Sequence, residues 1–252
     1  MRNLKKAVMA GGLVALLVLW LFPAQSATVN YAKVTFLEGK AYKGKNENGP
    51  WSAIRRGNVI SGGIFLKTEE NTKLELTMPD GSKLRLGANT LMHLESAKLT
   101  NSEPTRDYSA RIIQGKVYAR ATPNKNKNSK FTMRSGSAVA GARGTAFNTI
   151  LLPDGATQVK CYEGQVWVAT WADYAQRYLR EGPQPMPQPG EWRAPDTIPG
   201  PEVVKEEEWI RIASAMMSVT IGADGTIQDP TQFSQSDMDA WEQWNLKRDG
   251  LQ

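Results

Sequence analysis

Residues 139–149 read VAGARGTAFNT, with two glycines three positions apart inside a run of small and β-branched side chains. Such a run favours a strand, and a glycine within it marks a bulge, a sharp bend or a close approach between backbones. The same stretch superficially resembles a phosphate-binding loop, but it lacks the lysine of that motif and the helix that should follow. We therefore interpret Gly144, Thr145 and Phe147 as structural residues of a β-protein.

The chain around this stretch consists of short strand-like runs from residue 29 to residue 168. Residues 73–78 and 83–86 alternate polar and apolar side chains, which is typical of half-buried strands. Asp80 and Gly81 form a turn signal between these two runs. No segment of the region has a convincing 3.6-residue period, so the sequence predicts an all-β domain.

A short pattern occurs three times, as LEGKAY at 37–42, IQGKVY at 113–118 and YEGQVW at 162–167. The dipeptide Asp80-Gly81 also recurs at 154–155. Repeats that stack short strands indicate a β-helix or a β-sandwich-like fold. A glycine followed by alternating apolar residues is also a common strand-turn-strand pattern, and chance remains an alternative explanation.

These motifs follow one another in an order that resembles the FecR domain of bacterial envelope proteins. The resemblance begins at Trp51 with Arg56-Gly57 and Gly62-Gly63. It continues through Asp80, Gly81, Gly115, Gly144, Thr145, Phe147, Glu163 and Gly164. The resemblance implies a compact β-helix or β-sandwich-like domain over residues 28–170. Regulator members of the family sense an outer-membrane receptor and control a sigma factor through a cytoplasmic N-terminal region. Residues 1–6 are too few for such a region, so we expect a stand-alone exported FecR domain.

The N-terminus has the layout of a secretory signal peptide. Arg2, Lys5 and Lys6 precede an uncharged apolar run at 7–22, and small residues follow at Ala24 and Ser26. We predict a cleaved signal peptide over residues 1–27 and a periplasmic or secreted protein. An uncleaved inner-membrane anchor is the alternative, although the run is shorter than the ~20 residues that span a bilayer.

The chain changes character after residue 170. Residues 171–201 form a predicted Pro-rich linker, with possible helical turns at 171–179 and seven prolines between 181 and 201. Residues 202–252 form an acidic extension that we expect to be mainly helical. Its first helix would place Trp209, Ile212 and Met216 on one face, and its second would start near Ser236 with Asp239 in a capping box.

The charge is divided unevenly along the chain. Residues 28–180 carry a net charge of +11, and residues 181–252 carry −8. Asymmetry of this kind often marks an interaction surface. The possible partner-binding residues are Lys125, Lys127, Lys130, Trp209, Trp241 and Trp244. They would contact an envelope protein, an anionic glycan or a membrane surface; alternatively, the acidic extension folds back on the basic domain.

The sequence offers little for catalysis. His93 and Cys161 are the only histidine and the only cysteine, and no metal-ligand spacing or nucleophile motif is present. Nothing indicates a cofactor or a small-molecule substrate, and nucleic acid is an unsuitable partner for an exported protein. We predict a non-catalytic, protein-binding or sensing module of the envelope. A glycan- or cell-wall-binding module and a membrane-anchored regulator of iron-type signalling are the alternatives.

Overall fold

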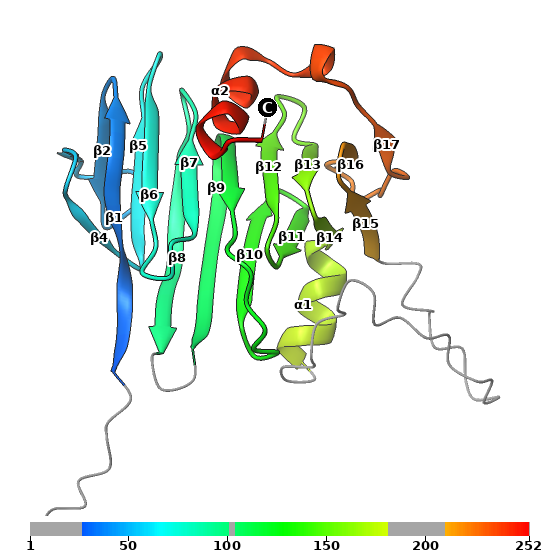
Figure 1. Cartoon of the computed structure of the whole chain (residues 1–252), viewed down its shortest axis with the longest axis horizontal. Helices are drawn as coiled ribbons and strands as arrows, with labels where there is room; N and C mark the ends of the chain where they lie inside the picture. The colour runs from blue at the N-terminus through cyan, green and yellow to red at the C-terminus, as the bar shows by residue number, and fades with distance from the viewer. Residues whose placement is uncertain (1–26, 101–103, 181–209, 252) are drawn as a thin grey trace, which may run out of the picture.

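The computed structural model describes residues 27–100, 104–180 and 210–251, and these residues are predominantly β (Figure 1). The strands are β1 (Thr28–Glu38), β2 (Ala41–Gly44), β3 (Ser52–Ala53), β4 (Val59–Ser61), β5 (Ile64–Thr68), β6 (Lys73–Thr77), β7 (Lys83–Leu86), β8 (Leu91–Thr100), β9 (Thr105–Arg120), β10 (Lys130–Ser135), β11 (Ala138–Ala142), β12 (Ala146–Leu151), β13 (Thr157–Glu163), β14 (Gln165–Thr170), β15 (Ile210–Ser214), β16 (Met217–Ile221) and β17 (Thr231–Gln232). The helices are α1 (Trp171–Arg180), a 3₁₀ turn η2 (Gln235–Asp237) and α2 (Ala240–Asp249).

The strands form two sheets that share β9 and also β1, whose first residues, 28–30, pair with β8 of sheet A. In sheet A the order is β3-β2-β5-β8-β9-β10-β11-β14-β15. In sheet B the order is β4-β1-β6-β7-β9-β12-β13-β16-β17. Leu66, Met92 and Met133 of sheet A belong to the same hydrophobic cluster as Leu76 and Val159 of sheet B. The prediction of an all-β, sandwich-like fold is therefore confirmed.

The repeated pattern of the sequence marks the places where the chain passes from one sheet to the other. Residues 105–114 of β9 pair with β8 in sheet A, and residues 115–120 pair with β12 in sheet B. At the bend, Gly115 has φ +85°, and a Cβ there would lie 2.5 Å from Oγ1 of Thr90. Gly39, between β1 and β2, and Gly164, between β13 and β14, occupy equivalent crossings. Each of the three copies of the pattern thus contains a glycine with positive φ at which the chain passes from one sheet to the other.

The C-terminal extension contributes strands to both sheets. β15 pairs with β14 in sheet A, and β16 pairs with β13 in sheet B. The helix predicted across Trp209, Ile212 and Met216 is wrong, because residues 210–214 are a strand; Trp209 itself lies outside the described residues. The free edge of β14 supplies hydrogen-bond partners, and the Ile-Arg-Ile sequence suits a strand, so tertiary pairing overrides the helical spacing.

The second predicted helix is present as α2, but it begins at Ala240 and not near Ser236, which lies in the separate turn η2. Asp239 is its N-cap and accepts a hydrogen bond from the Glu242 N–H, while the Glu242 carboxylate accepts one from the Asp239 N–H. Gly250 ends the helix in a left-handed conformation. Helix α1 occupies the start of the predicted linker, and residues 181–201 of that linker lie outside the described residues.

Of the predicted signal peptide, residues 1–27, all but Ala27 lie outside the described part of the chain. Within the described residues, no helix combines the length and the apolar character that crossing a bilayer requires.

The first glycine of the opening motif allows a close approach between strands. Gly141 of β11 lies opposite Trp167 of β14, and a Cβ at position 141 would lie 2.0 Å from Cζ2 of the indole. Trp167 is buried and stacks on Tyr174 of α1, with ring centroids 5.8 Å apart. The indole is rigid, so an added methyl group has to displace the ring or the strand.

We expect Gly141→Ala to lower the free energy of unfolding by about 1–3 kcal/mol, the usual cost of overpacking a core. Chemical denaturation of the wild-type and variant proteins measures this difference. Adding Trp167→Leu to the variant removes the clash and should reduce the further loss caused by the alanine. A Gly141→Ala protein as stable as the wild type would contradict the proposed role of this glycine.

Candidate interaction surfaces

The motif positions lie in turns and in the core. Asp80 accepts a hydrogen bond from the Ser82 N–H at 2.9 Å and pairs with the buried Arg106 at 3.0 Å. Burial opposes ionisation of Asp80, but the Ser82 N–H and Arg106 outweigh it and lower the pKa of the carboxyl. Phe147 and Thr145 are buried. These positions build the domain and expose little for a ligand to contact.

Glu163 pairs with Arg120 across sheet B, next to the crossing at Gly164. His93 stacks on Phe65 with ring centroids 4.2 Å apart. Cys161 is fully buried, and this burial raises the pKa of its thiol to about 12. Among the described residues no group of histidine, cysteine and carboxylate side chains could hold a metal ion.

The predicted basic residues lie in the loop between β9 and β10. Lys125 and Lys127 are exposed, and Lys130 begins β10. The loop is fastened by Asn124, whose side-chain amide donates to Pro104 O at 3.2 Å, and by Asn126, which donates to Thr105 Oγ1 at 2.9 Å. The predicted tryptophans Trp241 and Trp244 belong to α2 and pack elsewhere, so the structure does not join these residues into one surface.

A surface that the sequence did not single out lies along β1 and β4. Val59 and Tyr31 are large apolar side chains with exposed fractions of 54% and 39%. Their neighbours Ala32 and Ile60 are paired in register and buried, so the alternate positions of both strands face outward. We call Tyr31, Lys33, Arg55, Arg56 and Val59 the β1–β4 edge.

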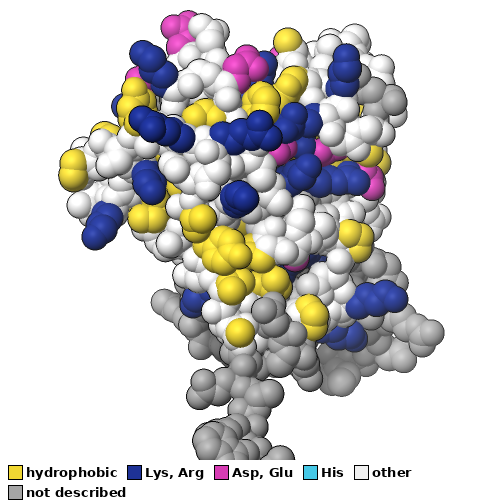
Figure 2. Space-filling model, turned by 60° about the vertical axis from the view of Figure 1, so that its left-hand side comes forward, with side chains coloured by type: hydrophobic (Ala, Val, Ile, Leu, Met, Phe, Trp, Pro, Cys, Tyr) yellow, Lys and Arg dark blue, Asp and Glu magenta, His cyan; other side chains and the backbone are white. Residues whose placement is uncertain are grey.

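The β1–β4 edge belongs to the side of the molecule that comes forward in Figure 2. In this view an apolar patch is surrounded by Lys and Arg side chains, with few acidic side chains near it (Figure 2). Lys33, Arg55 and Arg56 are exposed, and the ion pairs among the described residues do not include them. Strand β4 pairs only with β1 among the described strands, which leaves its other side as a sheet edge.

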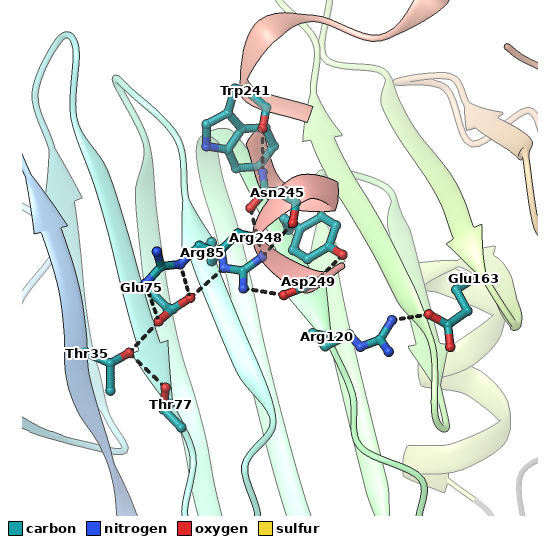
Figure 3. Close-up of polar contacts among 11 residues, drawn as sticks. Thr35, Glu75, Thr77, Arg85, Arg120, Glu163, Trp241, Asn245, Arg248 and Asp249 are labelled. Atoms are coloured by element: carbon teal, nitrogen blue, oxygen red, sulfur yellow. Dashed lines mark hydrogen bonds and ion pairs between the residues drawn. The ribbon is translucent and has the colours of Figure 1, made fainter. Parts of the chain in front are cut away.

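Helix α2 covers a different basic area, on sheet B (Figure 3). Arg85 of β7 is fully buried and donates to Glu75 of β6 at 2.7 Å. The same guanidinium pairs with Asp249 of α2, which also accepts a hydrogen bond from the Tyr118 hydroxyl at 2.7 Å. Arg248 of α2 donates to Glu75 at 2.9 Å. Two carboxylates and two guanidinium groups thus alternate across the contact.

Burial would raise the pKa of Glu75, but hydrogen bonds from Arg248 and Arg85 outweigh it and lower the pKa to about 2. Further along α2, Glu242 pairs with Lys160 at 3.0 Å, and Asp239 pairs with Lys116. Helix α2 of the acidic extension therefore folds back on the basic domain. This was one of the alternatives that the charge asymmetry left open.

The two tryptophans of α2 take part in this packing. Trp241 is buried, with the Lys116 ammonium 4.9 Å from its ring centroid. Trp244 lies against Phe36, with ring centroids 5.5 Å apart, and the Lys73 ammonium is 5.3 Å from its ring. Intramolecular contacts thus occupy both side chains, which leaves Trp241 in particular little surface for a partner.

One part of the chain matches a known protein family. Residues 65–167, from β5 into β14, match the family model described as FecR protein. This segment is a FecR domain. Proteins of the FecR family are regulatory and associated with the envelope, and in general they are not enzymes. Strands β1 to β4 and β15 to β17 lie outside the matched range, yet they pair with strands of the FecR domain in the same two sheets.

Two solved structures are similar to the chain. Both are crystal structures of a candidate anti-sigma factor from Parabacteroides distasonis ATCC 8503, at 14% and 16% sequence identity with TM-scores of 0.45 and 0.46. Each alignment covers 70% of this chain and 63% of the other protein. No curated protein matches the chain.

Proposed function

We propose that this protein is a non-catalytic, periplasmic FecR-domain module that binds a protein partner through the β1–β4 edge. The observation that carries the proposal is the exposed apolar pair Tyr31 and Val59 beside the cations Lys33, Arg55 and Arg56. Single exposed apolar residues are ordinary on a surface, but apolar side chains grouped at a charged sheet edge are typical of interaction sites. The FecR domain supports a regulatory role, and the signal-like sequence at residues 1–27 supports export.

The chemistry of the edge indicates the kind of partner. Strand β4 has unpaired backbone groups on its outer side, and an extended segment can add to such an edge through main-chain hydrogen bonds. The exposed cations next to this edge favour acidic side chains in that segment and disfavour basic ones. We therefore expect the partner to present an extended, acidic stretch with apolar side chains that contact Tyr31 and Val59.

A site-specific crosslink in living cells tests this proposal. We expect a photoreactive amino acid at Val59 to give one discrete protein adduct, because this side chain would lie within the interface. The charge-reversed variant Lys33→Glu/Arg56→Glu should reduce the adduct at least several-fold, since complementary charge steers association. The adduct is measured by blotting, and its partner and the N-terminus of the mature protein by mass spectrometry.

Two controls make the test specific. The photoreactive group at Thr226, exposed in the turn after β16, should give no such adduct. Lys125→Glu/Lys127→Glu makes the same charge change in the β9–β10 loop and should leave the Val59 adduct intact. Loss of the adduct in the loop variant alone would move the partner site to the predicted lysines. The absence of a discrete adduct at Val59 would overturn the proposal.

A further inference from the structure

A groove of about 750 Å³ lies where three connections of the chain meet. Its walls come from the β2–β3 connection, the end of β5 with the residues after it, the β7–β8 turn and the end of the sheet A part of β9. The lining side chains are mostly polar: Glu47, Asn48, Trp51, Lys67, Thr68, Glu69, Glu70, Asn89, Thr90, Leu91 and Gln114. The volume falls within the ~300–1,000 Å³ of typical small-ligand sites.

Trp51 is the one aromatic side chain in this lining, and its neighbours hold it in place. A Cβ at Gly44 would lie 3.2 Å from Cε3 of the indole, and one at Gly49 would lie 2.9 Å from Cδ1. The ring thus packs against backbone that has no side chain to intervene. It remains half-buried, and the Lys67 ammonium lies 6.0 Å from its centroid. Trp51 is a rigid apolar surface inside a polar groove.

The charges of the groove partly compensate one another. Glu47 lies 3.8 Å from Arg111, and Glu69 accepts a hydrogen bond from the Tyr42 hydroxyl at 2.9 Å. Glu70 and Lys67 are exposed and of opposite sign. A polyanion would face three carboxylates, whereas a cation would meet the Lys67 ammonium beside the aromatic ring. The groove therefore favours an uncharged ligand.

The hydrogen-bonding groups that remain suit hydroxyl groups. Asn48, Asn89 and Gln114 are exposed amides, each of which both donates and accepts, while Glu70 accepts and Lys67 donates. A hydroxyl group also donates and accepts, so each hydroxyl of a ligand can find both kinds of partner here. The face of the indole carries partial negative charge and attracts the weakly positive C–H bonds on one face of a sugar ring.

We infer that this groove binds an uncharged oligosaccharide of pyranose sugars, with Trp51 as the stacking surface and the amides of Asn48, Asn89 and Gln114 as hydroxyl partners. The site is separate from the β1–β4 edge, since the two sets of residues do not overlap. A protein with both surfaces binds a protein partner and a neutral glycan of the envelope independently. Each binding activity can be lost without the other.

A panel of immobilised oligosaccharides tests the inference with the full-length mature protein. The panel contains uncharged oligomers of N-acetylglucosamine, glucose and mannose, together with sulfated and uronic-acid oligomers. We expect binding to at least one uncharged series and weaker binding to the anionic ones. Trp51→Ala should weaken the binding about tenfold or more, because a central tryptophan is a typical hot spot. Trp51→Phe should retain part of it.

Trp171→Ala is the matched control, since it removes a half-buried tryptophan on α1 and should leave the affinity unchanged. The unfolding midpoint of each variant separates lost binding from lost folding. In the wild-type protein, titration with the bound oligosaccharide should also shift the backbone amide NMR signals of Asn89 and Gln114. Failure of every uncharged oligomer to bind, a preference for the anionic panel or unchanged affinity in Trp51→Ala would each overturn the inference.

Discussion

Glu75→Ala is expected to lower the free energy of unfolding by about 3–5 kcal/mol, the usual cost of removing one partner from a buried ion pair. Glu75 is 2% exposed and Arg85 is fully buried, so the guanidinium would lose one of its two carboxylate partners while remaining shielded from water. Arg248 of α2 would lose the same carboxylate. Chemical denaturation followed by circular dichroism measures the difference.

The double variant Glu75→Leu/Arg85→Met provides the comparison. It replaces the pair with apolar side chains of similar size, and such replacements are often close to neutral. Asp249 would then lose one of its partners, so we expect an intermediate loss of stability. If the single and double variants were equally unstable, the cost would come from lost packing and not from the uncompensated charge.

The pH dependence of the free energy of unfolding is an independent test of the contribution of Glu75. The folded protein lowers the pKa of Glu75 from 4.5 to about 2, so its ionised form is stabilised by folding. This contribution is fully present above the unfolded value and is lost as the pH falls from about 4.5 towards 2. The stability advantage of the wild type over Glu75→Ala should therefore shrink across this range. An advantage independent of pH would contradict the proposed ion pair.

Trp241→Ala is expected to lower the free energy of unfolding by a similar amount, about 3–5 kcal/mol, because the indole holds α2 against the sheet. The side chain is 8% exposed and packs between Lys116 and Gly87, where a Cβ would lie 3.3 Å from the indole Cε2. It belongs to a cluster with Tyr118, Tyr162 and Leu246. Hydrogen exchange of the α2 amides and chemical denaturation together distinguish local undocking from global unfolding.

Trp241→Phe keeps an aromatic ring at this position and should recover part of the loss. If Trp241 instead served mainly to bind a partner, as the sequence suggested, the opposite result would be expected. In that case Trp241→Ala would leave the stability and the exchange of α2 unchanged and would weaken only the contact with the partner. The two outcomes are separable because the first is measured on the isolated protein.

The sequence predicted the features that depend on local chemistry. Alternation at 73–77 identifies β6, and Asp80-Gly81 identifies the turn between β6 and β7. The polar residues around Ser236 and Asp239 indicated the start of a helix, although its N-cap is Asp239 and not Ser236. The repeated glycine pattern indicated similar strand-turn-strand units, but it did not show that the chain changes sheet at each glycine.

The remaining features depend on pairing between distant segments. Residues 210–214 form a strand because β14 offers them an edge, and this edge exists only once the sheet has formed. The groove around Trp51 combines residues from 47 to 114, so no single stretch of sequence contains it. The β1–β4 edge was missed for another reason. Its apolar residues Tyr31 and Val59 look like core residues until the register with buried Ala32 and Ile60 is known.

Strands β15 and β16 lie far along the sequence from the rest of the two sheets, and this position affects how the chain folds. Strands β13 and β14 pair on one side with β12 and β11, which precede them, but their partners on the other side, β16 and β15, come only after residues 181–209. Until residues 210–221 dock, each of the two sheets ends in an open strand edge of the kind that promotes association between chains. A chain held at this stage would be prone to exchange strands with a second copy, so slow release or stalling during synthesis would favour swapped dimers over monomers.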